Sequence, residues 1–261
     1  MTELFRRSAV DLAGMIRSRE VSAREVLDSC LARIDAVNPA LNAIVTLAPE
    51  IAHHRAADAD QAIADGDELG PLHGLPVAHK DLELTAGIRT TMGSPLFADF
   101  VPKEDGLIAQ RMRAAGAVVL GKTNTPEFGA GSHTFNEVFG RTMNPYDLSR
   151  TCGGSSGGAA VALAADMIPI ADGSDMGGSL RNPAAFCNVV GLRPSYGRVP
   201  AWPNRTPWSG LGTSGVLARS VDDLALQMQA VAGPDPRVPI SLPEPGSVFA
   251  TIDDLDLAGV R

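Results

Sequence analysis

The chain has 261 residues, of which 44% are hydrophobic and 20% are charged, as in an ordinary globular protein. Its formal net charge is −8 and its aromatic content is only 5%, which argues against a nucleic-acid surface. The length is sufficient for one large hydrophobic core. The longest apolar stretch, residues 159–171, contains Asp166 and is too short to span a bilayer, so no membrane partner is expected.

The three cysteines are widely spaced and odd in number: Cys30, Cys152 and Cys187. No paired-cysteine or Cys/His spacing is present, so we expect no disulfide framework, no metal site and no cofactor. The N-terminal residues 1–14 lack the apolar core of a signal peptide. These features together predict a cytoplasmic protein.

The first predicted elements are helical. Ser22 and Glu25 have the spacing of a capping box, and apolar residues recur at helical intervals from Val26 to Val37. A second helix is predicted over residues 49–64, half exposed because it is rich in Ala and Asp. Residues 75–79 then favour a strand that ends at Lys80.

The remaining predicted elements alternate between helix and strand, and Ser220 and Asp223 are placed to cap the last of them. This alternation predicts an α/β layer fold in which helices cover a sheet. The elements are helices over residues 106–115 and 157–165, strands over residues 117–120 and 167–171, and a last helix that ends near residue 232.

One segment matches a phosphate-binding motif but lacks the structural context that the motif requires. Residues 116–123 match the phosphate-binding pattern GxxxxGK[ST] letter for letter. A phosphate-binding loop needs a flexible segment between its glycines, but residues 117–120 are Ala-Val-Val-Leu, which favour a strand. We therefore do not expect nucleotide binding.

Two serines lie in glycine-rich turns. Ser155 stands in GGSSGG (residues 153–158), Ser179 stands in GSDMGGS (residues 173–179), and Lys80 follows an apolar stretch. Serine becomes nucleophilic when a base takes its proton, and glycines allow backbone N–H groups to surround a reacting carbonyl oxygen. Burial of a lysine lowers its pKa and makes it a usable base. The three residues therefore have the chemistry of an acyl-transfer site.

These motifs also have plainer interpretations. GGSSGG is typical of a flexible linker, but an apolar helical segment starts directly after Gly158. Lys80 taken alone could be a surface lysine, but the strand before it is apolar. Ser155 also matches the GxSxG elbow of α/β-hydrolases, which needs a later histidine. All histidines precede Ser155, and residues 144–152 are loop-like, so this alternative needs a histidine beyond the present sequence.

The order, spacing and flanks of these motifs resemble the amidase signature family, from the predicted helix after Ser22 to about Gly233. The resemblance implies a mixed β-sheet covered by helices on both faces. Family members continue well beyond residue 261, so the chain resembles their N-terminal portion and its sheet is expected to be incomplete. We predict a helical segment packing on the core (1–70), the α/β core (71–233), and a linker with the start of a further part (234–261).

The resemblance also implies roles for the site residues. Ser179 is the nucleophile, Ser155 is a bridging serine held by a cis peptide bond, and Lys80 is the general base. The expected oxyanion hole consists of the backbone N–H groups of Met176, Gly177, Gly178 and Ser179. Supporting positions, for which a purely structural role is an alternative, are Ser156, Asp175 and Arg181.

Two other positions, Met176 and Asp172, are variable or usually less polar in the family.

The function that the resemblance implies is an amidase that cleaves a carboxamide C–N bond through an acyl-enzyme. The alternatives are a glutamine-hydrolysing amidotransferase A-type subunit and an inactive truncated fragment. The expected partner is a small-molecule amide, with no nucleic acid unless the chain is amidotransferase-like, and a homodimer is left open.

Overall fold

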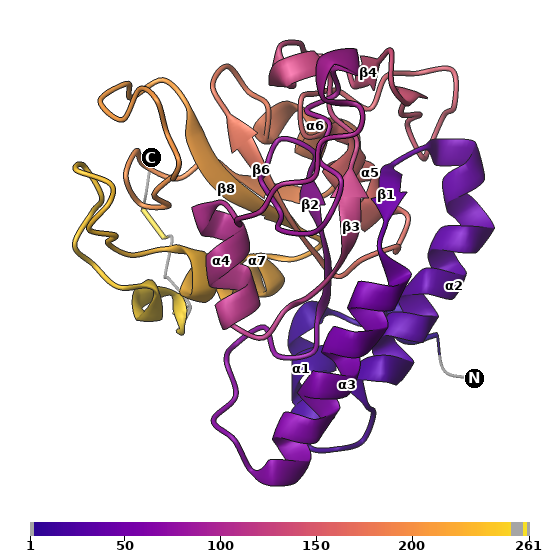
Figure 1. Ribbon diagram of the computed structural model, residues 1–261, viewed down its shortest axis with the longest axis vertical. Coiled ribbons are helices and arrows are strands. Elements are labelled where there is room, and N and C mark those ends of the chain that lie inside the picture. Colours follow the sequence, from indigo (N-terminus) through magenta and orange to yellow (C-terminus); the bar gives the residue numbers. More distant parts are fainter. Residues whose placement is uncertain (1–2, 252–257, 260–261) are drawn as a thin grey trace.

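The computed structural model describes residues 3–251 and 258–259, and a six-stranded mixed sheet lies at its centre (Figure 1). The strand order is β1-β3-β2-β6-β8-β7, in which β2 is parallel to both of its neighbours and the other pairs are antiparallel. These strands are β1 (Ile44–Leu47), β2 (Pro76–Lys80), β3 (Val118–Thr123), β6 (Ile170–Asp175), β7 (Val190–Leu192) and β8 (Thr213–Ala218). A separate small sheet pairs β4 (Phe135–Asn136) with β5 (Gly140–Arg141).

Helices cover both faces of the central sheet. Successive residues of β2 show this, because Ala78 packs in a core with residues of α2, α3 and α5, whereas Val77 packs in a core with residues of α1, α4 and α7. Side chains alternate between the two faces of a strand, so both faces are buried. The helices are α1 (Ala9–Arg17), α2 (Ala23–Leu41), α3 (Pro49–Asp65), α4 (Leu107–Ala114), α5 (Gly157–Ala164), α6 (Arg181–Phe186) and α7 (Val221–Val231).

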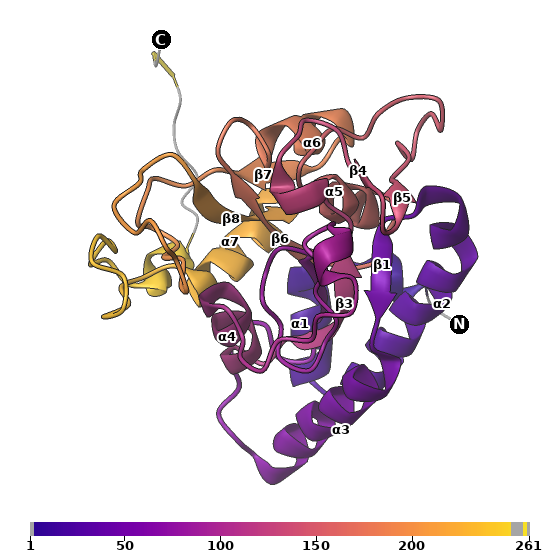
Figure 2. The ribbon, with the colours of Figure 1, turned by 45° about the horizontal axis from the view of Figure 1, so that its top comes forward.

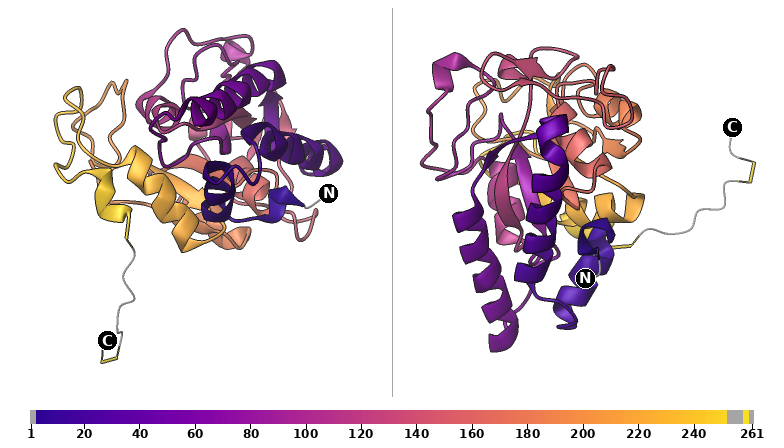
Figure 3. Two further views of the ribbon diagram at one scale, coloured as in Figure 1. Left: turned by 90° about the horizontal axis from the view of Figure 1, so that it is seen from below. Right: turned by 90° about the vertical axis from the view of Figure 1, so that its right-hand side faces the viewer.

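The predicted mixed sheet with helices on both faces is therefore confirmed. Figures 2 and 3 show α2 and α3 lying side by side, on the opposite side of the molecule from residues 233–249, which follow α7. Single 3₁₀ turns occur at η1 (Leu4–Arg6), η2 (Pro95–Phe97), η3 (Glu127–Gly129) and η4 (Gly246–Phe249).

The helix starts follow local hydrogen-bond chemistry. At α2 the Glu25 N–H donates to Ser22 Oγ at 3.1 Å, and the Ser22 N–H donates to the Glu25 carboxylate at 2.8 Å, which confirms the capping box. Helix α3 begins with Pro49, which lacks an N–H and has a fixed φ suited to that position. At α7, Ser220 Oγ accepts the Asp223 N–H, but the Asp223 carboxylate caps α1 instead, where it accepts the Val10 N–H at 3.0 Å.

Two predicted strand ranges were wrong at their ends. The strand predicted over residues 167–171 is β6, which begins at Ile170 and continues to Asp175. The chain must turn after α5, where Asp166 has a φ of +60°, and Pro169 cannot donate a ladder hydrogen bond. The strand predicted over residues 117–120 extends to Thr123, because Lys122 and Thr123 continue the pairing with β2.

Residues 233–249, which follow α7, lie against the rest of the fold. Arg111 of α4 donates to the carbonyl groups of Val231 and Gly233 at 2.7 and 3.0 Å. The guanidinium of Arg237 stacks 4.4 Å from the centre of the Trp202 ring. The division at residues 70 and 233 stays a prediction, although β1, within the first 70 residues, joins the sheet as an edge strand.

All three cysteines, Cys30, Cys152 and Cys187, are buried free thiols. Within residues 3–251 and 258–259, no helix has both the length and the apolar character needed to cross a membrane.

Candidate active site

The site forms at the edge of the sheet where parallel strands end together. Lys80 is the last residue of β2, and Asp175 is the last residue of the neighbouring β6. The GGSSGG turn, which leads into α5, meets the same edge. Open α/β sheets bind ligands outside the carboxyl ends of their strands, so this is the expected place for a site.

The Lys80 amine is buried among three serine hydroxyls. Its side chain is 1% exposed, and its Nζ lies 2.7 Å from Ser155 Oγ, 3.0 Å from Ser156 Oγ and 3.2 Å from Ser174 Oγ. The peptide bond between Gly154 and Ser155 is cis. Sequence reasoning missed Ser174, although its position two residues after Asp172 on one strand places both side chains on the same face.

Burial lowers the pKa of Lys80 from 10.5 to about 7, because the ammonium form loses its hydration. The carboxylates of Asp172 and Asp175 act in the opposite direction and favour the ammonium form. The result is an amine that is partly neutral at physiological pH. A neutral amine at this position can accept a proton from a hydroxyl within hydrogen-bond distance.

The turn that carries Ser155 is a packed part of the fold. A Cβ added to Gly158 would lie 2.3 Å from Asn124 N, and a Cβ added to Gly157 would lie 2.2 Å from Thr134 Oγ1. Both distances are far below van der Waals contact, so only glycine fits at these two positions. This packing excludes the interpretation of GGSSGG as a flexible linker.

Asp175 organises the second glycine-rich turn. Its carboxylate accepts the N–H groups of Gly178 at 2.8 Å and Leu180 at 3.1 Å. It also accepts hydrogen bonds from the side chains of Arg181 and Arg193. Burial acts to raise the pKa of Asp175, but the hydrogen bonds from Arg181 and from the main-chain amides outweigh it and hold the pKa well below its usual range.

The two turns are joined through Ser179. Its carbonyl oxygen accepts the Ser156 N–H at 3.1 Å, which links the residue predicted as nucleophile to the serine cluster around Lys80. The Ser179 side chain itself makes no hydrogen bond to Lys80 or Ser155 among the described residues. The structure therefore brings Lys80 and Ser155 into direct contact and leaves the Ser179 hydroxyl uncommitted and partly exposed.

The amide groups of the second turn divide into two kinds. The Gly178 N–H donates to Asp175, so the turn already uses this predicted oxyanion donor. Within the described part of the chain, the N–H groups of Met176, Gly177 and Ser179 donate to no other group. The Met176 side chain is 67% exposed and does not obstruct them from the protein side.

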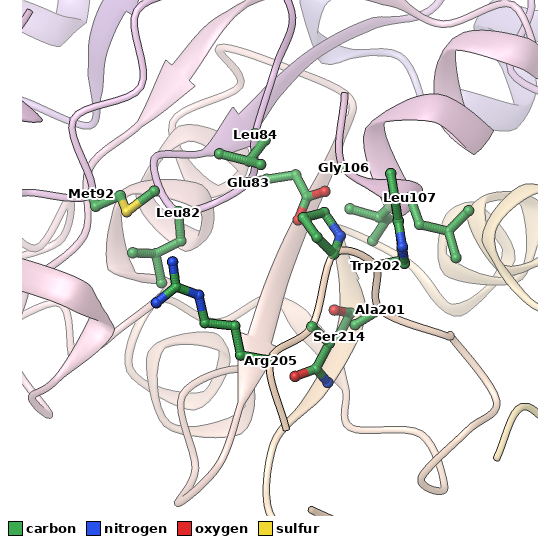
Figure 4. A pocket seen from close by; sticks show the side chains of 13 residues that line it. Leu82, Glu83, Leu84, Met92, Gly106, Leu107, Ala201, Trp202, Arg205 and Ser214 are labelled. Atoms are coloured by element: carbon green, nitrogen blue, oxygen red, sulfur yellow. The ribbon is translucent and has the colours of Figure 1, made fainter. Parts of the chain in front are cut away.

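A cavity of about 470 Å³ adjoins the site (Figure 4). Its walls include Leu82, Met92 and Trp202, and the Arg205 side chain extends along it. Ser214 also lines the cavity and pairs with Ser174 across β6 and β8, so the cavity lies next to the Lys80 cluster.

One acidic residue, Glu83, lines the cavity, and the buried Lys122 lies close to it. Burial raises the pKa of Glu83, which favours its neutral form. Burial lowers the pKa of nearby Lys122, whose Nζ donates to Thr85 Oγ1 at 2.8 Å and to the Glu83 carbonyl. Within the described residues, no cluster of three or more His, Cys, Asp or Glu side chains is suited to a metal ion.

Comparison with known proteins shows the family to which the chain belongs. The Amidase family model matches residues 25–255. The chain belongs to this family, the amidase signature enzymes. The A subunit of the glutamyl-tRNA(Gln) amidotransferase of Acidothermus cellulolyticus is 46% identical over the whole of this chain and 52% of its own length. The corresponding subunit from Methylococcus capsulatus is 42% identical over 99% of this chain and 53% of its own length.

Solved structures of amidase signature enzymes share the fold. A bacterial aryl acylamidase superposes with a TM-score of 0.88 at 35% identity, over 92% of this chain and 50% of its own. A 6-aminohexanoate cyclic dimer hydrolase superposes with a TM-score of 0.85 at 37% identity, over 94% of this chain and 50% of its own. The chain thus spans about half the length of the relatives that it matches.

Proposed function

We propose that this chain carries the nucleophile and base of an amide hydrolase that works through an acyl-enzyme on Ser179. The contact that supports the proposal most strongly is the 2.7 Å distance between the buried Lys80 amine and Ser155 Oγ. Neutral Lys80 takes the proton of Ser155, and Ser155 in turn takes the proton of Ser179. The Ser179 oxygen then forms a bond to the amide carbonyl carbon.

The negative charge that develops on the carbonyl oxygen needs hydrogen-bond donors. We assign this role to the uncommitted N–H groups of Met176, Gly177 and Ser179 and omit Gly178, whose N–H Asp175 accepts. As the C–N bond breaks, protonated Lys80 returns its proton through Ser155 to the leaving nitrogen. Water then attacks the ester carbon, and the same relay restores the Ser179 hydroxyl.

The cavity beside Ser174 is the proposed place for one end of the substrate. Apolar walls at Leu82, Met92 and Trp202 favour a hydrocarbon or aromatic group of moderate size. A Cβ on Gly129 would lie 2.6 Å from Leu82 Cδ1 and 3.6 Å from Ser155 Oγ, which places this wall close to the reacting hydroxyls.

The test is labelling with a serine-directed fluorophosphonate, followed by mass spectrometry of the modified peptide. We expect the label on Ser179 and expect Ser179→Ala to abolish it. A panel of amides added as competitors then ranks substrates by the slowing of labelling. Label on another serine, with Ser179 unmodified, removes Ser179 from the nucleophile role. No label on any serine of the folded chain supports the alternative of an inactive fragment.

A second candidate function is that of a glutamine-hydrolysing amidotransferase subunit. It is favoured by the 46% identity to the A subunit of a glutamyl-tRNA(Gln) amidotransferase. The same Ser179 chemistry would then release ammonia from glutamine for use by a partner protein. Ammonia release from glutamine that requires a partner and tRNA supports this candidate, whereas hydrolysis of simple amides by the protein alone supports the first.

A further inference from the structure

A buried pair that the proposed mechanism does not use lies directly behind Lys80. His79 is 0% exposed and Asp172 is 2% exposed. His79 Nδ1 lies 2.9 Å from Asp172 Oδ1, and the main-chain N–H of Lys80 donates to the same oxygen at 3.3 Å. Asp172 Oδ1 therefore interacts with both the His79 ring and the Lys80 main chain.

This contact stands where the strand pairing stops. Strands β2 and β6 pair at Val77 with Ile170 and at Ala78 with Ala171, and the register does not continue to Lys80. The N–H of Lys80 therefore has no ladder partner on this side and is held by the Asp172 side chain. On its β6 side the Lys80 main chain is held by a side chain that can itself rotate, whereas on its other side Lys80 pairs with Thr123 of β3.

His79 restrains that rotation. Because an ionised carboxylate only accepts hydrogen bonds, the proton of His79 must be on Nδ1. Its Nε2 is buried and has no hydrogen-bond partner among the described residues. Such unsatisfied atoms are uncommon in protein interiors and call for an explanation. Here the ring leaves one nitrogen unpaired while the other fixes Asp172.

We propose that His79 and Asp172 are positioning residues that hold Lys80 in place against the serine cluster and keep a negative charge beside it. The inference rests on the proposed function, in which Lys80 is the base. Asp175, at the end of β6, is a second carboxylate that acts on Lys80. The charge of Asp172 also acts on Lys122 of β3 and on Glu83 after β2, so these groups belong to the same electrostatic environment.

The chain offers an unusually direct test because it contains only three lysines: Lys80, Lys103 and Lys122. Lys80 and Lys122 are buried, and Lys103 is exposed. Protein labelled with ¹³C at lysine Cε gives three NMR signals, which Lys80→Met and Lys103→Arg assign. The Lys80 signal then reports the protonation of its amine, whether or not the protein turns over a substrate.

Asp172→Asn keeps an oxygen acceptor of the same shape and removes the charge. We expect the midpoint of the Lys80 titration to fall by about one pH unit, as loss of a nearby opposite charge predicts. The matched control is Asp223→Asn, which removes another buried carboxylate, the one that accepts the Val10 N–H. The control is expected to leave the Lys80 midpoint unchanged. An unchanged midpoint in Asp172→Asn overturns the inference.

Two His79 variants test the orienting contact. His79→Asn keeps an N–H donor close to the Nδ1 position, whereas His79→Leu fills similar space without a donor. We expect His79→Leu to speed hydrogen exchange of the Lys80 amide at least about tenfold and His79→Asn to change it less than about twofold, because exchange follows local opening. Equal exchange rates of the Lys80 amide in the two variants would contradict the orienting role of His79. If Asp172→Asn does not fold, these variants decide the matter.

Fluorophosphonate labelling of the same variants separates this inference from the proposed function. If the Lys80 midpoint and amide exchange respond as expected but Ser179 is never labelled, the positioning role stands and the amidase function fails. If Ser179 is labelled equally fast in His79→Leu and wild type, and the titration midpoint and amide exchange of Lys80 do not change, the amidase function stands. The positioning role is then overturned.

Discussion

Asp175 and Arg181 are joined by two side-chain hydrogen bonds of 3.0 Å, one to each carboxylate oxygen. Such bidentate pairs combine charge with fixed geometry. The carboxylate also accepts the main-chain amides of Gly178 and Leu180, on either side of Ser179. One side chain therefore shapes the turn that presents the proposed nucleophile.

We expect Asp175→Asn to lower the free energy of unfolding by about 2–3 kcal/mol, because hydrogen bonds to a charged group are lost in a buried place. The lowered pKa of Asp175 sets the pH dependence. Its contribution in the wild type is complete above the unfolded pKa near 3.8 and is lost as the pH falls through the lower folded pKa. Urea unfolding at pH 7 and at pH 3 measures both effects. A variant as stable as wild type at pH 7 contradicts this role.

Lys80→Met should remove the base and keep the volume. The acylation rate of Ser179 is expected to fall by at least about a thousandfold, whereas the fold persists because a buried amine is replaced by an apolar group. In the wild type the rate should rise with pH around a midpoint near 7, since only neutral Lys80 accepts a proton. Fluorophosphonate labelling between pH 5 and 9 provides the measurement. Near-normal rates in Lys80→Met at pH 7 would remove Lys80 from the base role.

The same lysine should make stability depend on pH. Its folded pKa of about 7 lies below the unfolded value of 10.5, so between these values the unfolded chain binds more protons. Stability therefore rises as the pH increases through this window. Unfolding free energies at pH 7 and 9 should differ less in Lys80→Met than in wild type. An identical difference in both proteins argues that the Lys80 pKa is not lowered.

Ser155 and Ser174 both contact the Lys80 amine, but replacing them by alanine should slow the acylation of Ser179 to different extents. Ser155→Ala breaks the proposed proton path and is expected to slow acylation of Ser179 by about a thousandfold or more. Ser174→Ala removes only one of three hydroxyls around Nζ, at 3.2 Å, and should slow it less than about tenfold. Comparable losses in the two variants would argue against a dedicated bridging role for Ser155.

Gly158→Ala tests the packing of the first turn. A Cβ there would lie 2.3 Å from Asn124 N and 2.7 Å from the Ala43 carbonyl oxygen, so main chain would have to move. We expect a loss of about 3 kcal/mol in unfolding free energy, at the upper end for overpacking. Gly177→Ala is the control, because nothing lies within 4 Å of its added Cβ. Equal stability of the two variants would contradict the packed turn.

The sequence predicted helices better than strands. The capping box at Ser22 and the apolar spacing of α2 are local signals, and the structure confirms them. Strand β8 has no such signal, because its segment Thr213–Ala218 includes small residues and follows a long loop. Its position depends on pairing with β6 and β7, which are distant in sequence. Strand β6 was predicted too early because the apolar run ends before the strand does.

The same difference applies to the site. Lys80, Ser155 and Ser179 stand in motifs that single out each residue along the chain. The contacts of Ser174 and of the His79–Asp172 pair arise only when β2, β6 and the GGSSGG turn come together. The use of the Gly178 amide by Asp175 is likewise a matter of three-dimensional geometry. The residue types and motifs predicted the kind of chemistry at the site. The hydrogen-bond partners of each site residue became clear only from the fold.

Burial of the native thiols makes the protein convenient for site-directed dye attachment. Loss of hydration raises the pKa of Cys30 and Cys187 to about 12 and that of Cys152 to about 11, so the reactive thiolate is scarce at neutral pH. A cysteine introduced at Leu96, which is 82% exposed, would react with a maleimide while the native cysteines stay silent. Fluorescent reporters can thus be attached to the otherwise unaltered chain.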